Sequence, residues 1–291
     1  MAPWFAARSL GVALALLALA EASQGPDTST RSVVKAAAGY VAEYQPQLTS
    51  IVADEVYTQE IVSQSPRDPQ MPRIRLMRSE VFFMFAPANH DWMAIRDVLA
   101  VDGNTLRDRP DLRESLQMLP AHDVAAKFKE YNSRYNIGRT YRNFNEPTLT
   151  LLVLDEHHRA RFSFDRKRVE RMGDAILVTI AFTEQESPTL IHDPKRGRVF
   201  SKGELIVEAG SGRVRRTMLT AKNEDVRLEL TTTYSADERL GIWVPTLFRE
   251  HYEHGAASTS RVLDSPSEYE RILCEARYSN FRRFETSVRM K

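Results

Sequence analysis

The chain has 291 residues, of which 42% are hydrophobic and 27% charged, with a formal net charge of +1. This balance excludes a disordered tail, and it gives no general attraction to nucleic acid or acidic membranes. The single cysteine, Cys274, excludes an internal disulfide.

Residues 1–22 are typical of a secretory signal peptide. Arg8 makes the start weakly positive, and the apolar run from Leu10 to Ala20 is too short to span a bilayer. Ala20-Glu21-Ala22 has the small-x-small form of a cleavage site. We therefore expect export to the periplasm or out of the cell, with residues 23–291 as a single domain without a transmembrane segment. An uncleaved anchor is the alternative.

The first part of the domain predicts one helix and then strands. Apolar residues recur every three or four positions over residues 31–50, which indicates an amphipathic helix. Pro46 is expected to kink or split this helix near residues 42–45. Strands follow at 51–61, 74–85 and 92–101, and Asp102-Gly103 is a hairpin signal.

Two short helices are predicted at about residues 110–135, inserted between strands. Pro110 suits a first helical position, and Gly138 a helix stop. His122 and Asp123 fit the first turn of the second helix, where acids are favoured. Both helices are apolar on one side, so we expect them to cover a sheet.

From residue 148 onward the pattern predicts strands separated by turns. The expected strands are 148–154, 159–165, 176–182, 204–209, 213–221, 226–234, 244–252, 261–263 and 272–288. The basic run 166–171 is expected to be a solvated turn. The fold class is mainly β (α+β), with about eleven antiparallel strands against three short helices.

The last strand, residues 272–288, alternates between a dry and a wet face. Cys274 and Tyr278 fall on the dry face, which predicts a buried, unreactive thiol. Asn280 and Arg282 interrupt that face, and Phe281 falls on the wet one. We expect Arg282 to pair with a buried acid or to close a cavity mouth, because an unpaired buried charge is costly.

No motif in the sequence declares a chemistry. It lacks a G-x-S-x-G elbow, an H-E-x-x-H motif, a phosphate-binding glycine loop and a dinucleotide fingerprint. The segment Asp155-Glu156-His157-His158 is the most metal-like, but it is interpreted as a hairpin tip whose side chains diverge. We therefore expect no catalytic residue, no metal site and no cofactor.

Several segments together resemble a known family of proteins. They are V-A-E-Y with L-T-S-I-V-A-D-E, R-D-V-L-A-V-D-G-N-T-L-R-D-R, R-Y-N-I-G-R-T-Y-R-N-F-N-E-P, L-G-I-W-V-P and Y-S-N-F-R-R-F. They resemble uncharacterised bacterial exported proteins that are similar in layout to the lipoprotein-carrier (LolA/LppX-like) superfamily. The resemblance implies an unclosed half-barrel whose helices cover its concave side. It implies a cavity for acyl chains and no catalytic residues.

Three functions follow as hypotheses. The first is an exported, non-enzymatic protein that binds a hydrophobic, acyl-bearing ligand such as a lipid or lipoprotein, because the apolar strand faces exceed what the helices cover. A core filled by its own side chains is the plain alternative. The second is an envelope protein-interaction or structural module using Tyr141, Arg142, Tyr278 and Arg282. The third is a hydrolase or metal enzyme using His157 and His158.

The first hypothesis also names residues that would line the cavity. These candidates are Phe82, Met84, Ile95, Leu99, Ile176, Val178, Ile180, Phe182, Tyr278 and Arg282.

Overall fold

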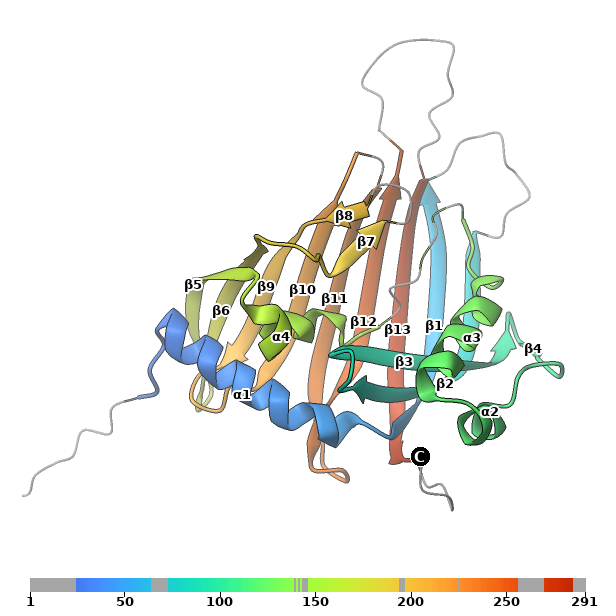
Figure 1. Ribbon diagram of the computed structural model, residues 1–291, viewed down its shortest axis with the longest axis horizontal. Helices are drawn as coiled ribbons and strands as arrows, with labels where there is room; N and C mark the ends of the chain where they lie inside the picture. The colour runs from blue at the N-terminus through green and yellow to red at the C-terminus, as the bar shows by residue number, and fades with distance from the viewer. Residues whose placement is uncertain are drawn as a thin grey trace, which may run out of the picture.

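The computed structural model describes residues 25–63, 73–138, 140, 142, 146–193, 197–224, 226–255 and 270–284. Over these residues the frame is an eleven-stranded antiparallel sheet that does not close into a barrel (Figure 1). This confirms the predicted fold class. The expected signal peptide, the expected strand at 261–263 and the last part of the expected strand 272–288 lie outside the described residues.

The strands of the large sheet run in the order β4-β3-β2-β1-β13-β12-β11-β10-β9-β6-β5. Their bounds are β1 Ile51–Ser63, β2 Ile74–Ala86, β3 Asp91–Val101, β4 Asn104–Thr105, β5 Phe162–Met172, β6 Ala175–Glu184, β9 Ser201–Glu208, β10 Val214–Lys222, β11 Val226–Asp237, β12 Ile242–His254 and β13 Glu270–Arg283. A separate pair is β7 Ile191–Asp193 with β8 Gly197–Val199. The helices are α1 Thr30–Leu48, α2 Leu112–Met118, α3 Ala121–Ser133, α4 Glu156–Arg159 and the 3₁₀ helix η1 Leu149–Leu154.

Helix α1 crosses one face of the sheet (Figure 1). The side chain of Ser29 accepts a hydrogen bond from the Ser32 amide and caps its start. The buried side chains of α1 share one face: Val33, Ala37, Ala38, Val41, Tyr44 and Leu48. Pro46 lies in the last turn and the helix continues to Leu48, so the expected split does not occur. Burial of the whole apolar face outweighs the one backbone hydrogen bond that a proline removes.

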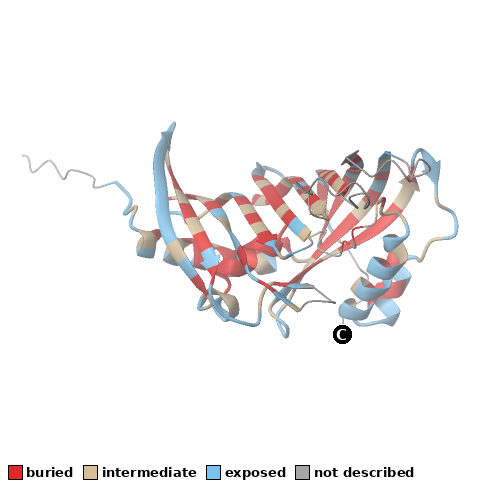
Figure 2. Cartoon of the chain, turned by 90° about the horizontal axis from the view of Figure 1, so that it is seen from above, coloured by how far each residue is buried: buried red, intermediate tan, exposed pale blue. Residues whose placement is uncertain are grey.

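The sheet is buried on both faces at one end. Its inner face, the one under α1 and η1, carries the main core, to which Val178, Phe248 and Tyr278 belong. Its outer face carries a smaller cluster, in which Phe82 and Ile95 pack against Leu116 and Phe128 of α2 and α3. The expectation that all three predicted helices cover the same, concave side was therefore wrong, because the apolar sides of α2 and α3 pack on the face opposite α1. Figure 2 shows the exposed edge strand β5 at one end and the two helices at the other. The second half of β2, residues 81–85, is therefore packed on both faces, which explains its continuous apolar run.

A β-bulge in β13 changes the face to which its last residues belong. Val52 pairs with Arg282 but Asp54 pairs with Ser279, so β13 contains one extra residue there. Asn280 has a φ of 51° at this point. The bulge turns Phe281 into the main core and moves Arg282 to the outer face, the reverse of the alternation expected from the sequence.

Three further expectations were wrong in the segment 148–171. The run Leu149–Leu154 is a fully buried 3₁₀ helix, because a short apolar run fits a buried helix as well as a strand. Glu156–Arg159 forms α4 and is therefore not a hairpin tip. The basic run is solvated as expected, but it belongs to β5, where positive charge protects an open sheet edge.

No helix in the described part of the chain is long and apolar enough to cross a membrane.

Candidate ligand cavity beside strand β3

The ten predicted lining residues divide between the two faces of the sheet. Val178, Ile180, Phe182 and Tyr278 are buried in the main core, and Ile176 packs against it. On the outer face, Phe82 and Ile95 are buried in the smaller cluster, and Met84 packs against that cluster. Leu99 is half-buried beside a register shift between β2 and β3. The lining role of the ten residues stays a prediction, and the structure does not bring them together.

A cavity of about 230 Å³ lies beside β3 and α3. Strand β4 pairs with β3 only at Ala100 and Val101, so the cavity follows a part of β3 that β4 does not cover. Of the ten predicted residues, Ile95 lines it. Its apolar wall comes from β2, β3 and α3: Met77, Trp92, Met93, Ala94, Ile95, Ala125 and Ala126.

Arg96 supplies a buried charge on the inner side of this cavity. Its guanidinium donates two hydrogen bonds to the Glu55 carboxylate, at 2.5 and 2.7 Å, and both side chains are at least 93% buried. Burial by itself lowers the pKa of Arg96, but the charge and hydrogen bonds of Glu55 raise it by more. The net effect is a raised pKa, so the guanidinium stays charged. The Asn132 amide donates to the Arg96 carbonyl at 2.6 Å, which fastens α3 to β3.

Arg142 is the second buried cation at the cavity. It donates to the Gln59 side-chain oxygen at 2.5 Å, to the Ile137 carbonyl at 2.8 Å and to Cys274 Sγ at 3.1 Å. Nearby, Glu250 accepts hydrogen bonds from Tyr57 and Tyr252, and burial raises the pKa of Glu250. The inner face at this end is therefore a buried network of charged and hydrogen-bonding side chains.

Glu146 and Lys129 line the cavity as well. Lys129 Nζ is 3.9 Å from Glu146 Oε1, and the lysine is half exposed whereas the glutamate is 19% exposed. Burial raises the pKa of Glu146 to about 8, although Lys129 opposes this. Glu146 is therefore largely protonated at neutral pH and can donate a hydrogen bond.

Three buried polar atoms of cavity-lining residues have no hydrogen-bond partner within the described structure: Arg142 Nε, Trp92 Nε1 and Asn132 Oδ1. The first two are donors and the third is an acceptor. Buried polar groups are nearly always bonded, so these three atoms are available to a water molecule or to a polar group of a ligand in the cavity. Ten further buried atoms without a hydrogen-bond partner belong to described residues that do not line this cavity.

Arg282 lies in a different hollow, on the outer face. It binds Asp54 at 2.8 Å and also contacts Glu80, so it pairs with acids as expected, but both acids are partly exposed. This hollow of about 360 Å³ is also lined by Asp97, which accepts from Arg109 at 2.5 Å. Two of its arginines, Arg109 and Arg282, are thus already paired with acids.

The residues named for a protein interface are largely unavailable to a partner. Arg142 is 3% exposed and Tyr278 is 5% exposed. Arg282 is partly exposed but paired, and Tyr141 lies outside the described residues. The sequence did contain a signal for the polar end: Glu55 and Arg96 fall among inward-facing apolar positions of their strands, where a charge needs a partner.

Comparison with known proteins gives several similar solved structures. One is a LolA superfamily protein from Nitrosomonas europaea, with 15% identity over 89% of this chain and 96% of that one and a TM-score of 0.33. Another is a domain described as outer membrane lipoprotein-sorting protein from Vibrio parahaemolyticus, with 8% identity over 88% and 95% of the two chains and a TM-score of 0.33. A third is a DUF1329 family protein from Desulfovibrio piger, with 11% identity over 88% and 98% of the two chains and a TM-score of 0.29. No protein-family model and no curated protein matches the chain. The neighbours carry the names that the sequence resemblance indicated, but the likeness is loose and no residue role is transferred from it.

Proposed function

We propose that this chain is an exported, non-enzymatic binding protein for a small amphipathic molecule with one short acyl chain and an oxygen-bearing head group. The ligand enters the cavity beside β3. The observation that carries this proposal is the set of unpartnered polar atoms around a cavity whose other wall is apolar. Two donors, Arg142 Nε–H and Trp92 Nε1–H, favour a head group with acceptor oxygens, such as a carboxylate, ester or phosphate.

The size of the cavity limits the apolar part of the ligand. A volume of about 150 Å³ suffices for one benzene molecule, and drug-sized pockets begin near 300 Å³. The cavity of about 230 Å³ lies between these values, which favours one short chain over several long ones. Burial of six methylenes contributes roughly 5 kcal/mol before ordering costs. A lipid or lipoprotein is also a candidate ligand if the end of only one of its acyl chains enters the cavity.

The test compares two probes of equal chain length. We expect octanoate to bind to the mature chain in isothermal titration calorimetry and octylamine not to bind, because the cavity offers donors and cationic side chains to the head group. Native mass spectrometry of the chain purified from a bacterial envelope, followed by organic extraction, then identifies the natural ligand class.

A matched pair of variants locates the site. Ala125→Trp fills the cavity from α3 and should weaken octanoate binding at least tenfold, whereas Lys127→Trp on the exposed side of the same helix should leave it unchanged. Equal binding by the two variants would place the ligand elsewhere. No binding of either probe, together with a bare mass from the envelope, would mean that the cavity holds only water.

A further inference from the structure

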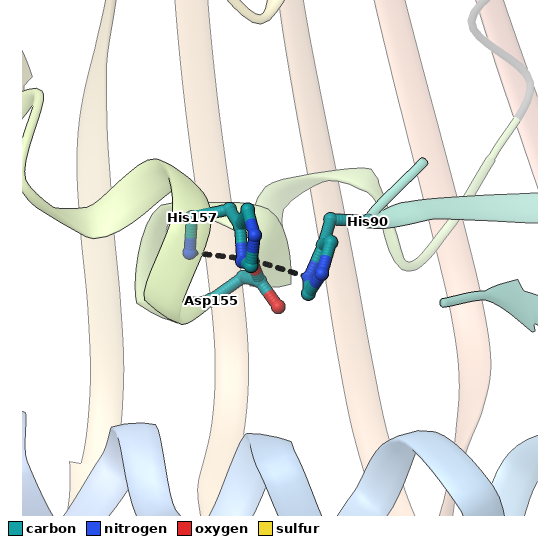
Figure 3. Close-up of side chains that lie close together, drawn as sticks. All are labelled: His90, Asp155 and His157. Carbon is teal, nitrogen blue, oxygen red and sulfur yellow. Dashed lines mark hydrogen bonds and ion pairs between the residues drawn. The ribbon is translucent and has the colours of Figure 1, made fainter. Parts of the chain in front are cut away.

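A second cluster of side chains lies where the β2–β3 turn meets α4 (Figure 3). His90 belongs to the turn, and Asp155 and His157 belong to the start of α4. One donor atom from each of the three lies within 4.8 Å of the others. The imidazole rings of His90 and His157 are stacked, with their centroids 3.2 Å apart. His90 Nδ1 is buried 3.4 Å from Asp155 Oδ1 and makes no hydrogen bond.

Asp155 is held in place from two sides. Its Oδ1 accepts the His157 amide at 2.9 Å, which caps α4, and its Oδ2 accepts the Gln45 side-chain amide of α1 at 2.9 Å. The residue is 5% exposed. Capping of α4 accounts for the position of one carboxylate oxygen of Asp155, but it does not account for the two histidine rings that lie beside the carboxylate. A hydrogen-bonded carboxylate of fixed orientation is the arrangement found around metal ligands.

Both ring nitrogens of His158 already have hydrogen-bond partners, and one of these bonds holds the turn. Arg161 donates to its Nδ1, and a guanidinium can only donate, so Nδ1 is the acceptor and Nε2 carries the proton. His158 Nε2–H therefore donates to the His90 carbonyl, at 2.8 Å. This bond fastens the turn carrying His90 to α4. His157 instead projects beside His90, with 56% of its side chain exposed.

We propose that His90, Asp155 and His157 form a binding site for a late first-row divalent cation, with Zn²⁺ as the reference ion. Two imidazole nitrogens and one carboxylate oxygen are a donor set that zinc accepts, and three protein ligands leave a coordination position for water or another ligand. Donors around a tetrahedral zinc are roughly 3.3 Å apart, so the side chains close inward by about 1 Å or a little more. The exposed His157 has the freedom to do so.

The other histidine–acid pairs of the described residues are simpler. His122 lies 3.5 Å from Asp123 and His251 lies 3.3 Å from Glu253. Neither pair has a third donor within the same distance in the part of the chain that the structure describes. The site also borders a hollow of about 300 Å³ that includes His90 and His158 and shares Asp91, Lys129 and Glu146 with the ligand cavity. The exposed side chain of His157 also leaves the site open to solvent.

The experiment uses the mature chain without a histidine tag, stripped with a chelator. Zinc affinity is measured by competition with a chromogenic chelator, and stoichiometry by elemental mass spectrometry after gel filtration. We expect one zinc per chain, and visible absorption of the Co²⁺ form that reports its coordination. His157→Ala should weaken binding by at least ~10-fold. It should not change the unfolding temperature of the metal-free chain, because His157 is exposed.

His192→Ala is the matched control, since His192 is an exposed histidine in β7 outside the cluster. It should bind zinc as the unchanged chain does. Equal affinities for the unchanged chain, His157→Ala and His192→Ala would overturn the proposal, as would a stoichiometry near zero at micromolar zinc. Octanoate binding is measured separately, so failure of the metal site and failure of the ligand cavity can be told apart.

Discussion

The inner face of the sheet differs between its two ends. Across β6, β9, β10 and β11 it is mainly apolar, and the side chains that fill this dry end are almost fully buried: Val178, Ile180, Leu205, Val207 and Leu219. The buried carboxylate in this region, Glu184, accepts hydrogen bonds from the amide and the hydroxyl of Ser201. Across β1, β3, β12 and β13 the same face contains the buried charges Glu55, Arg96 and Glu250 and an adjoining cavity. One sheet thus combines a self-filled core with a polar, incompletely filled end.

The two ends of the inner face contribute differently to the stability of the chain. A dry core gains free energy from each apolar side chain, whereas a buried ion pair seldom does better than apolar residues of the same volume. The buried charges of the polar end are therefore weak evidence for a gain in stability. The dry end is filled by its own side chains, as the alternative to a ligand cavity predicted for the core.

The largest effect is expected from breaking the buried pair. Arg96→Met should lower the free energy of unfolding by about 3–5 kcal/mol, because it leaves the Glu55 carboxylate buried without its main partner. Urea unfolding followed by circular dichroism measures this. Arg249→Met is the control: Arg249 pairs with Glu275 at 2.8 Å on the exposed face and should cost no more than about 1 kcal/mol. Equal losses would show that the polar end is not special.

Truncation in the dry end should come next. Ile180→Ala should cost roughly 3 kcal/mol, since it opens a new cavity in a close-packed region. Met93→Ala enlarges a cavity that already exists and should cost less. Both values come from the same urea titration. A larger loss for Met93→Ala than for Ile180→Ala would contradict the division into a filled and an unfilled end.

A smaller effect is expected from pH. The pKa of Glu146 is raised from its ordinary 4.5 to about 8, so between these values the folded chain holds a proton that the unfolded chain has lost. Stability should therefore fall as pH rises from 4.5 to 8. The expected change is on the order of 2 kcal/mol. This is less than the roughly 5 kcal/mol that ~1.4 kcal/mol per pKa unit would give over this shift, because the side chain retains solvent contact. Thermal unfolding across this range should show a flatter profile for Glu146→Gln than for the unchanged chain.

The smallest response concerns Cys274, which lies in the polar network but is fully enclosed. Burial raises the pKa of its thiol to about 12, so the thiolate is scarce at pH 8. The folded chain should not react with a thiol-specific disulfide reagent during an hour, and the chain in urea should react once. Prompt reaction of the folded chain would show that this end opens in solution.

Much of the fold was predictable because it follows from local pattern. The alternation in residues 176–182 and 244–252 gave the strands, and Asp102-Gly103 and Gly210-Ser211-Gly212 gave the turns, where positive φ angles are observed. Gly212 also lies so close to α1 that an added Cβ would be 2.1 Å from the Ala36 carbonyl oxygen. That contact between distant segments has no trace in the local sequence.

The candidate site was predictable only in part. A charge among inward-facing residues of a strand, such as Glu55 or Arg96, indicates a buried partner but does not name it. Arg142 lies in a part of the sequence without hydrophobic periodicity, and its buried hydrogen bonds reach Gln59 and Cys274, which are 83 and 132 positions away. His90 and His157 are 67 positions apart, and a turn and a short helix must dock before their rings can stack.

The sequence by itself determined the antiparallel strands, the amphipathic first helix, the paired short helices and the burial of Cys274, because hydrophobic periodicity and turn chemistry are local. Tertiary structure alone decided that Leu149–Leu154 is helical, that Phe281 points inward and Arg282 outward, and which buried charges meet. These outcomes depend on which segments compete for the same buried surface, and no single segment contains that information.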